Sequence, residues 1–171
     1  NTVTNKDEGL AASLNFRITD PSQEVSIEEF FKIYRNINRI ISFQHSLLAD
    51  TERCLARGEY REVVLNCATI IEKTLKEEII SYLDKEQTGE NIKKQILKHA
   101  NGYNKTRKLL EDFKITIDID YNKISTGTID IRNKVIHGGY FPTREEVVQA
   151  IKDAKLVIRE HNVQIFSDKT P

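Results

Sequence analysis

Residues 60–83, YREVVLNCATIIEKTLKEEIISYL, carry the longest helical pattern of the sequence. The apolar residues of this segment recur at intervals of three or four and form one broad stripe: Val64, Cys67, Ile70, Ile71, Leu75, Ile79 and Ile80. Such spacing is typical of a helix that buries one face in a protein core. The segment therefore predicts a long core helix.

The neighbouring segments also have helical spacing, and short breaks separate them. Helices are predicted at residues 46–56, 90–100, 104–113, 121–137 and 143–161. The pair Gly138 and Gly139 suits a left-handed C-terminal cap, and Thr143 with Glu146 has the capping-box signature of a helix start. Because the loops are short, the sequence favours an antiparallel helical bundle.

The first 44 residues have a different pattern. Apolar residues alternate from Leu10 to Ile18, which predicts a half-buried strand, and Ser26 with Glu29 opens a predicted helix. The chain is therefore divided into a strand–helix appendage at 1–44, a helical bundle at 45–165 and a tail at 166–171. Two interpretations of the appendage stay open: a remnant of a larger N-terminal domain, or an addition to a dimer by strand pairing.

Composition excludes several classes of protein. The 26 basic and 26 acidic side chains give no net charge, so overall charge indicates no particular partner. There is no apolar run of the roughly 18 residues that a membrane span needs. Cys54 and Cys67 fit neither a disulfide framework nor a metal-binding motif. These features indicate a cytoplasmic protein with reduced thiols, and we expect no metal and no cofactor.

A second segment, residues 129–146 (IDIRNKVIHGGYFPTREE), places Arg132, Asn133 and His137 among isoleucines and a valine. Imidazole can move a proton near neutral pH, and a guanidinium can stabilise negative charge that develops on phosphorus. A carboxamide can orient either partner without changing charge. This chemistry suits a phosphodiester. A structural interpretation also stays open, with His137 favoured by the helix dipole and Asn133 bonded to backbone groups.

The same helix is predicted to be apolar on two sides. At about 100° per residue, Ile124, Ile131 and Val135 share one face, whereas Ile129 and Ile136 lie near the opposite face beside the polar residues. A helix of this kind needs burial on two sides. The second side is covered either by another part of the chain or by a second copy, which would bring both sets of polar residues into one cleft.

The segment Arg132-Asn133-Lys134-Val135-Ile136-His137 resembles the R-x4-6-H motif of the HEPN superfamily (higher eukaryotes and prokaryotes nucleotide-binding). Residues 46–83 look like the opening helical hairpin of that family, and the likeness covers about residues 46–162. The resemblance implies an all-α bundle that forms a homodimer through the motif helices. It also implies that Arg132 and His137 are the catalytic pair, with Asn133 as the polar third member.

Many HEPN proteins are metal-independent endoribonucleases that act as toxins or in defence against phage, so the resemblance implies cleavage of RNA. We expect the RNA 2′-OH to attack the adjacent phosphorus, with His137 as general base or acid. Arg132 would stabilise the phosphorane and Asn133 would position the phosphate. Two alternatives stay open: an inactive HEPN module for dimerisation or for binding a nucleotide or protein, and a structural helical domain. The sequence identifies neither the target RNA nor a regulatory partner.

Residues 91–110 contain basic side chains and no acidic residue, which predicts a patch that follows an RNA backbone. The patch consists of Lys93, Lys94, Lys98, Lys105, Arg107 and Lys108. A solvated surface is the alternative. Tyr103 and Tyr140 are candidates for base stacking, although packing is the favoured interpretation for both.

The remaining ionisable residues are assigned less specific roles. Any of Glu72, Glu77 and Glu78 could support the motif, and the sequence does not select among them. The other histidines lack carboxylate or cysteine partners at metal-ligand spacing, so surface or packing roles are expected for His45, His99 and His161.

Overall fold

The computed structural model describes residues 43–44 and 46–167, with side chains up to His161. These residues belong to the compact unit Ile41–Pro171. The predicted strand and the helix after it, together with His45, lie outside the described residues. The strand–helix appendage therefore stays a prediction.

Every described element is helical, so the prediction of a mainly α fold is confirmed for this part of the chain. A helix at 46–56 is followed by α3 (Tyr60–Lys85), α4 (Glu90–His99), α5 (Tyr103–Asp112), α6 (Tyr121–Ile124), the π-helical turn η1 (Ser125–Ile129), α7 (Asp130–Gly138) and α8 (Arg144–Ser167). None of the described helices has the length and apolar character needed to cross a membrane.

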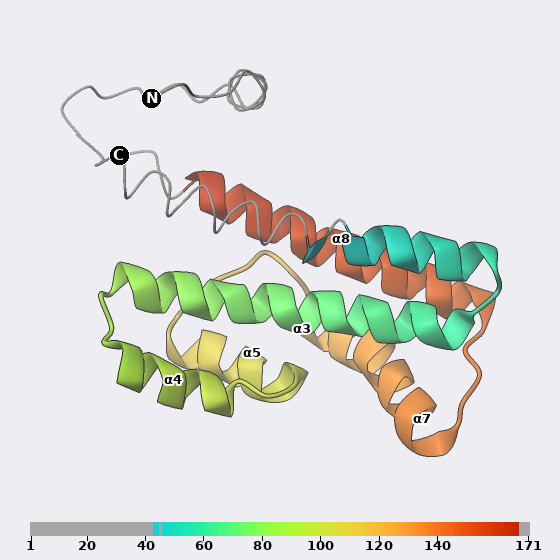
Figure 1. Cartoon of the computed structure of the whole chain (residues 1–171), viewed down its shortest axis with the longest axis horizontal. Helices are drawn as coiled ribbons and strands as arrows, with labels where there is room; N and C mark the ends of the chain where they lie inside the picture. The colour runs from blue at the N-terminus through green and yellow to red at the C-terminus, as the bar shows by residue number, and fades with distance from the viewer. Residues whose placement is uncertain (1–42, 45, 168–171) are drawn as a thin grey trace, which may run out of the picture. The chain divides into compact units, whose positions relative to one another are not determined.

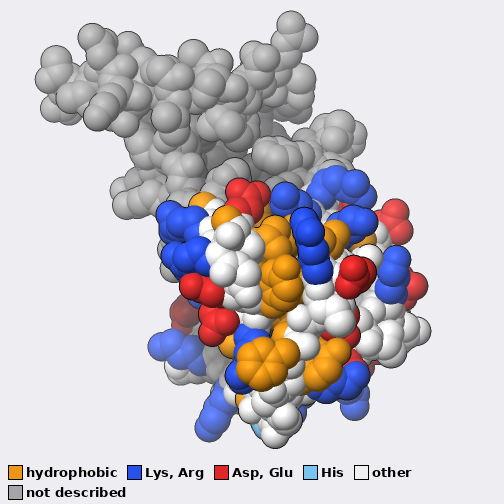
Figure 2. Space-filling model, turned by 90° about the vertical axis from the view of Figure 1, so that its right-hand side faces the viewer, with side chains coloured by type: hydrophobic (Ala, Val, Ile, Leu, Met, Phe, Trp, Pro, Cys, Tyr) orange, Lys and Arg blue, Asp and Glu red, His pale blue; other side chains and the backbone are white. Residues whose placement is uncertain are grey.

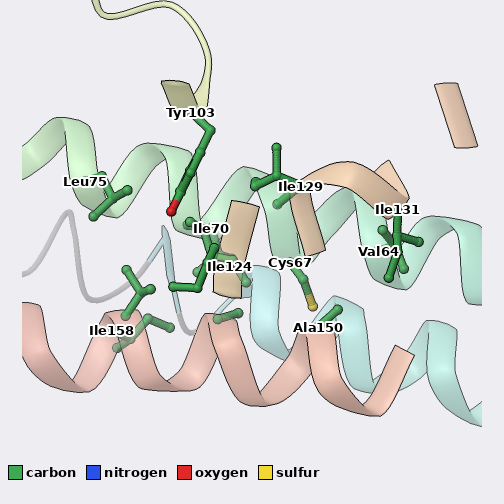
Figure 3. Close-up of a cluster of buried hydrophobic side chains, with 14 of the residues drawn as sticks. Val64, Cys67, Ile70, Leu75, Tyr103, Ile124, Ile129, Ile131, Ala150 and Ile158 are labelled. Atoms are coloured by element: carbon green, nitrogen blue, oxygen red, sulfur yellow. The ribbon is translucent and has the colours of Figure 1, made fainter. Parts of the chain in front are cut away.

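Helix α3 lies at the centre of the fold. Its predicted stripe is confirmed, because Val64, Cys67, Ile71, Leu75 and Ile79 are all fully buried. Helix α8 packs along α3, while α4 and α5 lie on another side of it (Figure 1). Side chains from α3, α8 and the 121–138 segment meet in one cluster (Figure 3). Full burial of one such aliphatic side chain contributes about 1.5–3 kcal/mol, so α3 organises the core.

The directions of the helices differ in part from the prediction. The helix at 46–56 turns back at Gly58, which has a left-handed φ of 72°, and forms an antiparallel hairpin with α3. Helices α3 and α8, however, run in the same direction (Figure 1). The segment from α4 to α7 returns the chain to the start of α3, so the expectation of an antiparallel arrangement is wrong for this pair.

The two cysteines are free and buried. Burial raises the pKa of the Cys67 thiol to about 12 and also raises the pKa of Cys54. Because the thiolate is the reactive form of cysteine, these shifts lower the reactivity of both thiols near neutral pH. Cys54 and Cys67 are thus not joined to each other in the structure.

The helix predicted over 121–137 contains a π turn. At this turn Thr128 Oγ1 donates to Asp153 Oδ2 of α8 at 2.6 Å, and Gln149 Nε2 donates to the other carboxylate oxygen at 2.7 Å. Gly127 lies against the same carboxylate, since a Cβ added there would be 3.7 Å from Asp153 Oδ2. The buried Asp153 therefore fixes the π turn on α8.

The π turn changes which side chains face the core. Ile124, Ile131 and Val135 are buried as predicted, but Ile129 is also buried, with 4% of its surface exposed. Ile129 is therefore covered by another part of the chain, one of the two predicted alternatives for the second face. The count of about 100° per residue does not hold through the π turn, which bonds five residues back. Ile136 is 50% exposed, so this isoleucine is not covered by the described part of the chain.

Both predicted helix ends beside the motif are confirmed. Gly139 has a left-handed φ of 63° and ends α7. Thr143 Oγ1 accepts from the Glu146 amide at 3.3 Å, and the Glu146 carboxylate accepts from the Thr143 amide at 2.7 Å. This reciprocal pair is a capping box, and it fixes the start of α8 close after the motif.

Candidate functional site

Arg132 lies on α7 in contact with two polar partners. Its Nη1 donates to Asn133 Oδ1 at 2.9 Å, and its Nη2 lies 3.6 Å from Glu72 Oε1 on α3. The Arg132 side chain remains 30% exposed. A guanidinium held this way keeps a fixed position and can still be reached by an anion from solvent.

Glu72 also organises the start of α5. Its Oε1 accepts a hydrogen bond from the backbone amide of Tyr103 at 3.3 Å. A carboxylate at this position satisfies an amide that the helix leaves unpaired and interacts favourably with the helix dipole. One carboxylate of α3 therefore links the motif helix α7 to the first turn of α5.

His137 is exposed in the last turn of α7 and forms no hydrogen bond or ion pair with a described residue. Asn133 precedes it by four residues, so their side chains leave the helix within about 40° of each other. Arg132 precedes it by five residues, so the angle between those two side chains is about 140°. In one chain, then, Arg132 is brought together with Asn133 and Glu72, whereas His137 shares a side only with Asn133.

Two members of the predicted basic patch are held in contacts within the chain. Lys93 pairs with Asp84 at the end of α3. The Arg107 guanidinium donates to Glu111 at 2.7 Å and to Asn122 at 2.9 Å, and lies 5.5 Å from the centre of the Tyr121 ring. Lys93 therefore joins α4 to α3, and Arg107 joins α5 to α6.

The other four members of the patch are exposed: Lys94, Lys98, Lys105 and Lys108. They form no ion pair with a described residue. A role in binding an RNA backbone stays a prediction for these four, and it is less favoured for Lys93 and Arg107.

The two tyrosines considered for base stacking are used in packing. Tyr103 is buried, and its hydroxyl donates to the Tyr121 carbonyl at 2.7 Å. The hydroxyl of Tyr140 donates to the Glu146 carboxylate at 3.1 Å. The favoured interpretation of both residues is therefore confirmed.

His161 is fully buried and contacts Glu78 through Nδ1, which joins α8 to α3. Its Nε2 has no hydrogen-bond partner among the described residues. The expected packing role is confirmed. Of the three glutamates considered as partners for the motif, Glu78 is thus used elsewhere and Glu72 is the one that contacts Arg132.

The part of the chain that the structure describes contains no group of three residues able to hold a metal ion. Comparison of the chain with models of protein families, with curated proteins and with solved structures gives no match.

Proposed function

We propose that the chain is a metal-independent endoribonuclease of the HEPN type, acting as a toxin or in defence against phage. The observation that supports this best is the motif helix: Arg132, held by Asn133 and Glu72, lies on the same short helix as the exposed His137. A fixed cation and a free imidazole are the two groups that phosphodiester cleavage by an internal hydroxyl needs.

In the proposed reaction, the RNA 2′-oxygen forms a bond to the adjacent phosphorus and the bond from phosphorus to the 5′-oxygen breaks. His137 either accepts the proton of the 2′-OH while water protonates the leaving 5′-oxygen, or donates a proton to the leaving oxygen while water accepts the proton of the 2′-OH. Arg132 stabilises the negative charge of the phosphorane, and Asn133 orients the guanidinium and the phosphate. The products are a 2′,3′-cyclic phosphate and a 5′-hydroxyl.

The angle between the motif side chains supports a composite site made by two copies. In one chain Arg132 and His137 point about 140° apart, so a single phosphate is reached more easily by Arg132 of one copy and His137 of another. Ile136, half exposed between them in sequence, supplies apolar surface for such a contact. A two-fold dimer places the same helix of both copies at one interface.

The test is incubation of RNA with the full chain in excess EDTA, followed by analysis of the new ends. The expected result is cleavage into fragments with cyclic phosphate and 5′-hydroxyl ends, and no cleavage of DNA of the same sequence, which lacks the 2′-OH. Absence of cleavage by a folded dimer would instead favour the alternative, an inactive HEPN module that binds a nucleotide or a protein.

Replacement of Glu72 by glutamine is expected to lower the cleavage rate about tenfold or more without unfolding the chain. Glutamine can still accept from the Tyr103 amide, but it loses the ionic contact with Arg132. Partly exposed ion pairs contribute about 0–1 kcal/mol to stability, whereas displacement of a positioned group by about 1 Å can reduce a rate about 100-fold.

The readouts are the single-turnover cleavage rate and the free energy of unfolding in urea. Glu77→Gln is the matched control, because Glu77 is a half-buried neighbour on α3 that forms no ion pair with a described residue. Equal cleavage by both variants would remove Glu72 from the site.

A further inference from the structure

The loop that joins α7 to α8 exposes an aromatic ring. Phe141 is 75% exposed, the highest value among the large apolar side chains that the structure describes; Ile92 follows at 58%. Figure 2 shows the side of the helical unit where this loop lies, with hydrophobic side chains open to solvent among basic and acidic ones. Burial is the usual state of phenylalanine, so this ring requires an explanation.

The residues around Phe141 are held in place, so its exposure does not result from a loose loop. Tyr140 donates to the Glu146 carboxylate, and this hydrogen bond raises the pKa of the Tyr140 hydroxyl. Pro142 is buried, and the Thr143 amide donates to Glu146 at 2.7 Å. Both neighbours of Phe141 are therefore fixed while its own ring points outward.

One side of the ring is occupied by Arg61. The Arg61 guanidinium carbon lies 5.1 Å from the centre of the Phe141 ring, which is within cation–π range. Its Nη2 also donates to the Val135 carbonyl of α7 at 3.3 Å. Arg61 therefore ties the ring to the motif helix and places a positive charge beside it.

We propose that Phe141 is a stacking platform for a base of single-stranded RNA, next to the phosphate that the motif cleaves. This inference rests on the proposed function. Phe141 follows His137 by four residues, so the two Cα atoms lie at most about 14 Å apart. Single-stranded nucleic acids bind to surfaces that combine aromatic rings, on which bases stack, with positive charge for the phosphates.

The charge beside the ring favours a nucleic acid over a second copy of the chain as the occupant. Arg61 is half exposed, and its guanidinium has the paired donors that match a phosphate. The position after the motif also puts the ring where the nucleotide flanking the cleaved bond would lie. RNA therefore supplies a partner for both groups: a base for the Phe141 ring and a phosphate for the Arg61 guanidinium.

The sequence contains no tryptophan, so Phe141→Trp in the full chain introduces a single reporter at this position. The probe is a short single-stranded 2′-O-methyl RNA, which cannot undergo the proposed cleavage. We expect saturable quenching of the tryptophan emission, at the same RNA concentration that saturates binding measured by anisotropy. An oligonucleotide of the same length without bases is expected to produce no quenching.

Affinity provides the second measurement. Phe141→Ala is expected to weaken binding of the probe about 5- to 150-fold, the range for loss of one stacked base, whereas Phe141→Tyr keeps the parent affinity. Val148→Ala is the matched control, since it removes an exposed apolar side chain from α8, outside the predicted basic patch, and it is expected to bind as the parent does.

Three results would overturn the proposal. The first is binding of RNA without quenching, or equal binding by Phe141→Ala. The second is tryptophan emission that changes with protein concentration before RNA is added, which would assign the ring to an interface between copies. The third is a parent chain that neither binds nor cleaves RNA, which would also remove the proposed function. If the parent cleaves RNA but either of the first two results is found, the proposed function stands and only the role of Phe141 is rejected.

Discussion

Replacement of His137 by alanine is expected to reduce the rate of RNA cleavage about 100- to 10,000-fold, the contribution typical of a positioned general acid or base. The fold should not change, because His137 is exposed and forms no hydrogen bond or ion pair with a described residue. Surface substitutions of this kind alter stability by about 0.5 kcal/mol or less. Loss of activity with unchanged stability would thus identify the imidazole as a chemical participant.

The measurement is the single-turnover cleavage rate of one RNA in EDTA, together with urea unfolding of each variant. His99→Ala is the matched control, because His99 is likewise exposed in the last turn of a short helix. Cleavage by His137→Ala at the parent rate would exclude the proposed mechanism. An equal loss in both variants would show that the effect is not specific to the motif.

The helices that the sequence predicts well are those whose pattern is complete within one segment. The stripe of α3 is determined by its own spacing, and Gly139 and the Thr143–Glu146 pair mark helix ends by local chemistry. The π turn could not be predicted in this way. It depends on Thr128 meeting Asp153, a residue 25 positions later in the chain, and local periodicity contains no information about that contact.

The same distinction between local pattern and distant contact applies to the residues of the candidate site. Arg132, Asn133 and His137 were identified because they lie close together in sequence, whereas Glu72 could not be distinguished from Glu77 and Glu78. The choice depends on how α3 is rotated relative to α7, which only the packed structure determines. Burial of Ile129 has the same origin. The sequence thus predicts where most helices form, but it does not predict the contacts between segments that lie far apart in the chain.

The pair formed by Glu78 and His161 leads to the largest expected effect on stability. Replacement of Glu78 by alanine is expected to lower the free energy of unfolding by about 1–3 kcal/mol, because removing one member of a buried polar pair leaves the other without a partner. His161 is fully buried, and its Nε2 already lacks a partner among the described residues, so it cannot easily recover the lost contact.

Further variants of Glu78 and His161 distinguish the contribution of the hydrogen bond to stability from that of burying two polar side chains. Glu78→Gln keeps an oxygen that can accept from Nδ1 of His161, so its loss of stability should be smaller than the roughly 1 kcal/mol that an ordinary hydrogen bond contributes. Replacing both residues by leucine should recover much of the stability lost in Glu78→Ala, since apolar substitutes for a buried pair are often tolerated.

Urea unfolding at one fixed pH gives these free energies by linear extrapolation. Glu77→Ala is the control, because Glu77 is adjacent on α3 but only half buried. A Glu78→Ala variant as stable as this control would mean that the contact with His161 contributes nothing to holding α8 on α3. A large loss in Glu78→Ala that the double leucine variant reverses would show that the unpaired imidazole, rather than the missing carboxylate itself, destabilises the fold.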